Sequence, residues 1–207
     1  MMERTHYLEL ISRYQADYLI FDLGGVLVDV APPVSVADDC CDIELPPLEV
    51  VEQRCRYIPE VEGFETGEAT PEEFGEAVVS NFSLPLSIPD FLMRYKSLIK
   101  GVIPAMESLL QELTAADYGL ACLSNTNPLH WQWVQDNTRL PQYFHEIFLS
   151  FEMGLVKPDT EIFCRVLEKL DIDARKVLFF DDKMENVQAA RNAGINAEAV
   201  ITPQIAG

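Results

Sequence analysis

Short apolar runs recur along the chain at spacings typical of buried strands. The first, Tyr18-Leu19-Ile20-Phe21, ends in Asp22 and a Gly-Gly turn. A short run without polar alternation is typical of a parallel strand that is covered on both faces. Similar runs cover residues 120–123, 147–149, 177–180 and 197–201.

Sets of apolar residues with helical spacing separate these runs in the second half of the chain. One set follows Pro104, a second follows Pro158, and a third precedes Gly194, which stands where a helix C-terminal glycine is expected. The first set consists of Met106, Leu109, Leu110 and Leu113, at i, i+3, i+4 and i+7. Strand and helix therefore alternate, and we expect an α/β fold with a doubly wound parallel sheet.

The residues between the first run and Pro104 contain no convincing strand but several amphipathic stretches. Candidate helices cover 47–57, 71–81 and 89–100, and Thr70 with Glu73 forms a capping box before the second. We interpret residues 32–100 as a helical cap inserted into a core of residues 1–31 and 101–207. The proline- and glycine-containing segments 31–33 and 101–104 are candidate hinges.

Composition limits the class of protein. With 207 residues, 48% of them hydrophobic, the chain can bury one sizeable core and a small second unit. No window approaches the length of a membrane span, and the N-terminus lacks the pattern of a signal peptide. The five cysteines are odd in number and form no C-x-x-C pair, so we expect reduced thiols in a soluble, cytoplasmic protein. They are Cys40, Cys41, Cys55, Cys122 and Cys164.

The formal net charge of -19 excludes several classes of partner. It repels nucleic acids and anionic lipid surfaces, so we expect neither as a partner. A small anionic substrate would need a local positive centre, which a bound divalent cation and a lysine can supply.

Polar residues follow the predicted strands at the points where the strands end. Asp22 follows the first run, Ser124-Asn125-Thr126 the second, and Asp181-Asp182 the fourth, while Lys157 lies in the loop after the third. Ligands bind beyond the carboxyl ends of the strands of an open parallel sheet, so we expect these side chains to converge. Asp181 and Asp182 could instead merely cap the helix that follows them.

An aspartate, a hydroxyl, an amide, a lysine and a carboxylate pair are the groups that phosphoryl transfer needs. Adjacent carboxylates repel each other unless a hard cation neutralises them, and an oxygen-rich site suits Mg²⁺. Ser124 and Asn125 can donate hydrogen bonds to phosphate oxygens, and Lys157 can stabilise the charge that develops on them.

Four segments of the chain resemble, in order, the four motifs of the haloacid dehalogenase-like superfamily. The resemblance covers the whole chain, and its segments are 21–27 (FDLGGVL), 123–125 (LSN), 154–158 (GLVKP) and 179–182 (FFDD). Segments 64–74 and 124–130 are also similar to a subgroup that contains a glucose-1-phosphate phosphatase and the N-terminal phosphatase domain of soluble epoxide hydrolases.

This resemblance implies an Mg²⁺-dependent hydrolase acting on a small phosphomonoester, such as a sugar phosphate. It implies that Asp22 forms an aspartyl-phosphate, which water then hydrolyses. It also implies that Asp22, the backbone carbonyl of Gly24 and Asp182 ligate Mg²⁺, with Asp181 as a second metal ligand or an outer-shell carboxylate. Asn186 falls where many relatives carry another acidic residue of the metal site.

Gly24 departs from the pattern, because most phosphatases of this family carry a second aspartate there. That aspartate protonates the leaving oxygen and later activates water, a contribution of roughly 10²- to 10⁴-fold. Three explanations stay open: a substrate with a good leaving group, a water that relays protons, or a cap residue that supplies the proton. Candidates for the last are Glu65, Glu68 and His130.

Two other functions remain as alternatives. In a 2-haloacid dehalogenase, Asp22 would attack carbon and no metal would be needed, which leaves Asp181 and Asp182 as an uncompensated cluster. A catalytically silent phosphate-binding module would explain Gly24 but not the retention of both Asp22 and Lys157.

Overall fold

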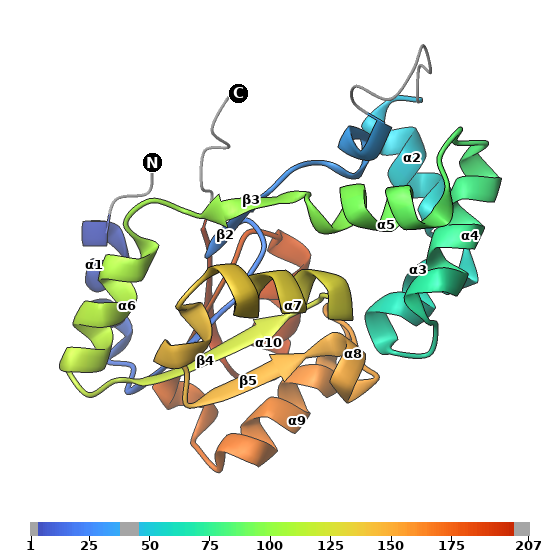
Figure 1. Ribbon diagram of the computed structural model, residues 1–207. Coiled ribbons are helices and arrows are strands. Elements are labelled where there is room, and N and C mark those ends of the chain that lie inside the picture. Colours follow the sequence, from blue (N-terminus) through green and yellow to red (C-terminus); the bar gives the residue numbers. More distant parts are fainter. Residues whose placement is uncertain (1–3, 38–45, 201–207) are drawn as a thin grey trace.

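A parallel sheet forms the centre of the fold (Figure 1). The computed structural model describes residues 4–37 and 46–200. Within them the strand order is β5-β4-β1-β6-β7, and every neighbouring pair is parallel. The strands are β1 (Tyr18–Phe21), β4 (Gly119–Ser124), β5 (Glu146–Leu149), β6 (Val177–Asp181) and β7 (Asn196–Ala199). The expected doubly wound α/β sheet is therefore confirmed.

Helices cover both faces of this sheet, which explains why its strands are continuously apolar. Alternate residues of β1 illustrate this, since Leu19 and Phe21 pack with one apolar cluster and Ile20 with the other. The first cluster includes α1 (Arg4–Tyr14), α6 (Met106–Ala115) and α7 (Pro128–Asn137). The second includes α9 (Thr160–Leu170) and α10 (Met184–Asn192).

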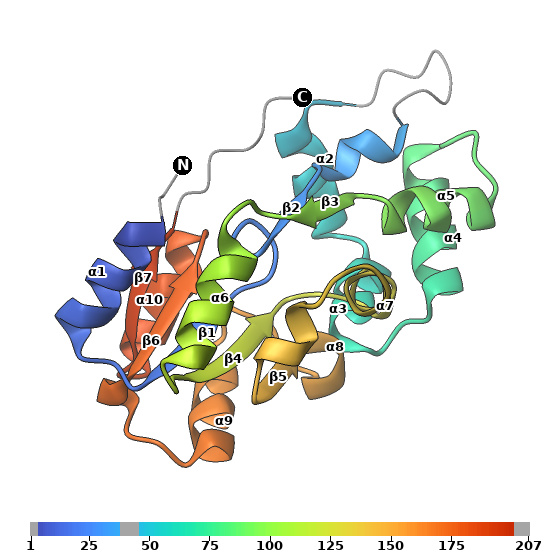
Figure 2. The same cartoon turned by 60° about the vertical axis from the view of Figure 1, so that its left-hand side comes forward.

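An antiparallel pair of short strands connects the core to a group of helices at one end of the molecule (Figure 2). The strands β2 (Val28–Val30) and β3 (Ile99–Val102) are the point at which the sequence prediction of no strand is wrong. They are only three and four residues long, and their pairing joins positions about seventy residues apart, so local pattern does not reveal them.

Between β2 and β3 the chain is helical and has an apolar cluster of its own, which includes Phe64, Phe74 and Phe91. The capping box of Thr70 and Glu73 is confirmed at the start of α4. The element α3 had no counterpart in the sequence prediction. The elements are η1 (Pro33–Ala37), α2 (Leu48–Cys55), α3 (Pro59–Thr66), α4 (Pro71–Phe82) and α5 (Ile88–Lys96). We call residues 32–37 and 46–98 the cap.

Beside the two connecting strands, the cap contacts the core through α5 against α7 and through α3 against α8 (Ser150–Met153). The end of α3 lies against α8, the short helix after β5, as Figures 1 and 2 show. Gly67, with φ of +81°, closes α3, and a Cβ atom there would lie 2.1 Å from the carbonyl oxygen of Phe151. Only glycine allows this approach without displacement of the backbone.

The remaining elements are α1, which the sequence did not predict, and the 3₁₀ turns η2 (Leu140–Tyr143) and η3 (Ala174–Lys176). None of the helices in the described ranges is long and apolar enough to span a membrane. Among the described residues, Cys55, Cys122 and Cys164 form no disulfide. Cys40, Cys41 and Ile201 lie outside the described residues.

Candidate active site

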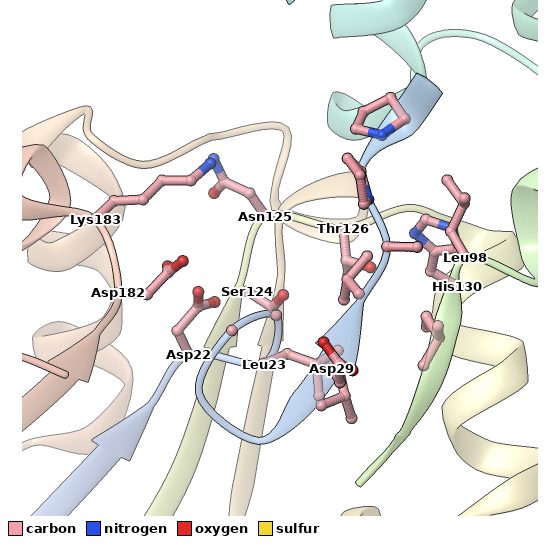
Figure 3. A pocket seen from close by; sticks show the side chains of 18 of the residues that line it. Asp22, Leu23, Asp29, Leu98, Ser124, Asn125, Thr126, His130, Asp182 and Lys183 are labelled. Carbon is pink, nitrogen blue, oxygen red and sulfur yellow. The ribbon is translucent and has the colours of Figure 1, made fainter. Parts of the chain in front are cut away.

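The residues that end the central strands meet at one edge of the sheet, around a cavity of about 780 Å³ (Figure 3). Asp22 follows β1, Ser124 ends β4, and Asp182 follows β6. Lys157 comes from the loop between α8 and α9. The structure thus brings together the strand-end side chains that the sequence singled out, with Asp181 in contact with Lys157.

A buried lysine organises the centre of the site. The Nζ atom of Lys157 lies 2.7 Å from Asp22 Oδ1 and 2.7 Å from Asp181 Oδ2. Its third contact is the carbonyl oxygen of Leu123, at 3.0 Å. Lys157 is 4% exposed, Asp22 8% and Asp181 0%, so water screens these charges little. The three hydrogens of the ammonium are all used within the protein, which fixes Asp22 Oδ1 in place.

Burial and charge act in opposite directions on these groups. Burial raises the pKa of the Asp22 carboxyl from 3.8 to about 6, although Lys157 lowers it in part. Burial acts to lower the pKa of the Lys157 ammonium, but Asp22 and Asp181 outweigh that effect and hold the pKa above its usual range. Lys157 therefore stays charged, while the pKa of Asp22 lies closer to neutral pH than that of a free aspartate.

Asp181 and Asn186 form the support behind Lys157. The amide Nδ2 of Asn186 donates to both oxygens of Asp181 at 3.0 Å, and the backbone N–H of Lys183 donates to Asp181 Oδ1 at 2.8 Å. Both carboxylate oxygens of Asp181 are thus occupied. Among the described residues Asn186 Oδ1 is buried without a hydrogen-bond partner, which leaves an acceptor oxygen available beside the carboxylates.

Three carboxylates lie close enough to share a cation. One oxygen each of Asp22, Asp181 and Asp182 lies within 4.8 Å of the others. Burial and the neighbouring charge of Asp181 raise the pKa of Asp182 as well. Gly25 permits this cluster, because a Cβ atom there would lie 2.6 Å from Asp182 Oδ2. These residues could hold a hard divalent ion, which would relieve their mutual repulsion.

Asn125 makes contacts that its position in the sequence does not reveal. Its Nδ2 donates to the carbonyl oxygen of Lys157, and its Oδ1 accepts from the backbone N–H of Lys157, both at 2.8 Å. The amide therefore holds the Lys157 loop onto β4, and Nδ2 keeps one hydrogen for a ligand. Ser150 performs a similar task, since its Oγ bonds both the N–H and the C=O of Thr126 at 3.0 Å.

The cap completes the wall opposite Asp22. Tyr95 of α5 stacks on His130 of α7, with ring centroids 4.5 Å apart. Asn127 Nδ2 contacts Tyr95 Oη and His130 Nδ1 at 3.2 Å, and His130 Nε2 donates to the Tyr95 carbonyl at 2.9 Å. Burial lowers the pKa of His130. Sequence reasoning missed Tyr95, Asn127 and Ser150; only the run 124–130 hinted at Asn127.

Comparisons with known proteins place this site in a family. The profile of the haloacid dehalogenase-like hydrolases matches residues 16–194. The sesquiterpene phosphatase astK of Aspergillus oryzae is 29% identical over 184 residues, 85% of each chain. The phosphorylated carbohydrates phosphatase of Thermotoga maritima is 26% identical over 86% of this chain and 81% of its own.

A solved structure gives the same result. It is an enzyme of the same family from Bacteroides thetaiotaomicron, in complex with magnesium and inorganic phosphate. It superimposes with a TM-score of 0.73 at 25% identity, and the match covers 92% of this chain and 98% of that one. Together with the convergent strand-end residues, these matches show that the chain belongs to the haloacid dehalogenase-like hydrolase family.

Proposed function

We propose that this hydrolase cleaves small phosphomonoesters in an Mg²⁺-dependent reaction through an aspartyl-phosphate on Asp22. The observation that carries the proposal is the ion pair of Asp22 with Lys157 at the floor of the cavity, beside the carboxylate of Asp182. Lys157 holds one oxygen of Asp22, so the carboxylate is oriented before any substrate binds.

The donor set fits Mg²⁺. Asp22, Asp182 and the backbone carbonyl of Gly24 would hold the ion, and Asp181, whose oxygens are already bonded, would act from the outer shell. When bound, Mg²⁺ would neutralise charge on the phosphate and on the carboxylates. The relative solved with magnesium and inorganic phosphate supports this assignment.

The side chains of this chain then have separate tasks. Asp22 attacks phosphorus and is regenerated by water. The Ser124 hydroxyl and the remaining N–H of Asn125 donate to phosphate oxygens. Lys157 orients Asp22 and adds a buried positive charge that favours an anionic transition state.

The cavity favours an uncharged alcohol group on the substrate. Glu52, Glu65 and Glu185 line it together with Lys183, so a second anionic group would meet net negative charge. A sugar phosphate satisfies this requirement. The related phosphatases named above act on sesquiterpene and carbohydrate phosphates, which supports an alcohol phosphate without narrowing it further.

The two alternatives are less well supported. A haloacid carries its own carboxylate, which would face the cluster of Asp22, Asp181 and Asp182. A silent binding module has no need of the buried Asp22–Lys157 pair, whose desolvation is costly.

The decisive experiment measures inorganic phosphate released from a panel of phosphomonoesters, with Mg²⁺ or with EDTA. We expect metal-dependent release that falls by roughly 10⁴-fold or more in the Asp22→Asn variant. Asp117→Asn, a matched change of an aspartate in a distant surface turn, should retain full activity. Absence of release from every substrate would contradict the proposal, and a 2-haloacid assay would then test the dehalogenase alternative.

A further inference from the structure

The proposed reaction needs a proton for the leaving oxygen, and Gly24 has no side chain to supply it. The three cap-side candidates differ in position. Both ring nitrogens of His130 are occupied, by Asn127 and by the Tyr95 carbonyl. Glu68 is exposed and is not among the described residues that line the cavity. Glu65 lines the same cavity as Asp22 and also the adjoining cap cavity, which reaches Lys157.

We propose that Glu65 of α3 is the general acid that protonates the leaving oxygen and the base that then activates water. This role rests on the proposed function. It places the proton donor on the cap, so the catalytic groups come from both parts of the molecule.

The direction of the reaction favours a donor on the cap. In phosphoryl transfer the attacking and leaving oxygens lie roughly in line on opposite sides of phosphorus. Asp22 lines this cavity from the core and Glu65 lines it from the cap, so a phosphate attacked by Asp22 can present its leaving oxygen to Glu65. Asp29 is the other half-buried carboxylate of this cavity, but it belongs to β2 on the core side. Glu52 and Glu185 also line the cavity and are exposed.

The surroundings of Glu65 suit a group that must carry a proton and then lose it. Its side chain is half-buried. Burial raises the pKa of the Glu65 carboxyl, and the nearby charge of Lys183 offsets part of that rise, while Glu62 adds to it. Figure 3 shows Lys183 extending above Asp182 toward Asn125, and Lys183 lines the same two cavities as Glu65.

The contact between cap and core fixes the position of Glu65. It lies two residues before Gly67, the residue that closes α3 against the Phe151 carbonyl. The end of α3 is therefore held on α8, in the part of the core that also carries Ser150 and the Lys157 loop. A positioned carboxyl can transfer a proton that an untethered one could not.

The proton balance closes over two steps. In the first, the bond from Asp22 oxygen to phosphorus forms, the bond from phosphorus to the leaving oxygen breaks, and Glu65 gives its proton to that oxygen, which leaves as an alcohol. In the second, water attacks phosphorus and gives one proton to the Glu65 carboxylate. The bond from phosphorus to Asp22 oxygen breaks, and phosphate leaves while both residues return to their starting state.

The test compares two substrates that differ in their need for an acid, p-nitrophenyl phosphate and an alkyl phosphate. The parameter kcat/KM reports the steps up to departure of the leaving group. We expect the ratio of kcat/KM for the alkyl ester to that for the aryl ester to fall by roughly 10²- to 10⁴-fold in Glu65→Gln. The matched variant Glu68→Gln, exposed and three residues away, should keep the wild-type ratio.

Each other outcome overturns the assignment. An unchanged ratio in Glu65→Gln, or equal losses on both esters, would show that Glu65 does not transfer the proton. A selective loss in Asp29→Asn in its place would move the role to Asp29. A wild-type protein that hydrolyses neither ester with Mg²⁺ would overturn the proposed function and this role together.

A second variant gives an independent readout. Gly24 has no positive φ, and the nearest atom to a Cβ built there is Val30 Cγ2 at 3.6 Å, an ordinary contact, so the backbone accepts a β-carbon at this position. Adding Gly24→Asp to Glu65→Gln should restore the lost ratio at least tenfold, because it supplies an acid from the core. Failure to restore any of the loss, with the double variant folded by circular dichroism, would contradict an acid role.

Discussion

The two walls of the active-site cavity are built on different principles. On the core wall, the buried charges are held by several short contacts: Lys157 by three, and Asp181 by Lys157, the Asn186 amide and a backbone N–H. On the cap wall, the side chains sit on an apolar cluster, and the cap contacts the core through α3, through Tyr95 of α5 against α7, and through the ribbon of β2 and β3. The core thus supplies charges in fixed positions, whereas the cap supplies side chains that rest on an apolar cluster.

The strongest way to break the core wall is Lys157→Met. It leaves Asp22 and Asp181 buried without a cation, so we expect unfolding to become easier by about 3 to 5 kcal/mol and turnover to fall by roughly 10²- to 10³-fold. The loss of stability should grow as pH rises, because deprotonation of Asp22 then leaves a buried negative charge without its cation. Urea denaturation at two pH values measures this.

The control for that change is Lys183→Met, which removes an exposed cation near the same cavity. We expect a change in the free energy of unfolding within about 0.5 kcal/mol. Equal destabilisation by the two variants would mean that the buried contacts of Lys157 with Asp22 and Asp181 contribute no more to stability than an exposed lysine does.

The pH dependence of stability tests the core wall while Lys157 stays unchanged. The Asp22 pKa is about 6 in the folded protein against 3.8 for a free side chain, so the folded state binds more protons between these values. Without metal, stability should therefore fall as pH rises from about 4 to 6, and the raised pKa values of Asp182 and Glu65 act in the same direction.

Mg²⁺ requires the deprotonated carboxylates, so the melting temperature should rise on its addition above about pH 6 and little below it. Thermal unfolding with Mg²⁺ and with EDTA across this range measures both effects. In Asp22→Asn the metal-free slope should flatten. A slope that Asp22→Asn leaves intact would assign the proton uptake to another group.

The cap contact is broken more gently by Gly67→Ala. A methyl group there meets the Phe151 carbonyl and a left-handed backbone, so we expect a loss of about 2 to 3 kcal/mol in stability and a lower kcat/KM for alkyl phosphates. Gly154→Ala is the matched variant, because its φ is +65° but a Cβ atom has no neighbour among the described residues within 4 Å. It should cost only about 1 kcal/mol. Equal losses would show that the contact is dispensable.

The smallest expected effect comes from a substitution in the cap, at the start of α4. Thr70→Ala removes the N-cap of α4, which should lower stability by about 1 kcal/mol. Because α4 carries no proposed catalytic group, kcat/KM should change by less than about twofold. A large loss of activity with little loss of stability would mean that the cap transmits local changes to the site.

The sequence predicts the core wall well because its groups end apolar strands. Asp22, Ser124 and Asp182 follow β1, β4 and β6, and parallel strands bring their ends to one edge. The roles are less readable. An asparagine after a strand can face a phosphate or a backbone, and Asn125 binds the Lys157 loop on both sides of its amide.

The cap wall is harder to predict because its contacts join distant positions. Tyr95 and His130 lie 35 residues apart and meet only in the folded chain. The short helix α3 has only eight residues and contains Gly63, a weak helix former, and it forms through packing of Phe64 on the cap cluster. Propensity alone therefore gives no signal for the element that carries Glu65.

The contact of α3 with α8 also restricts how the cap can move relative to the core. A body joined by two adjacent strands can swing about the line through them, and a third point of attachment away from that line removes the swing. Gly67 against Phe151 is such a point, and Tyr95 against His130 is another. A swing of the cap away from the core would then require both contacts to separate first, so residues without any reacting group can limit the rate at which substrate enters the cavity.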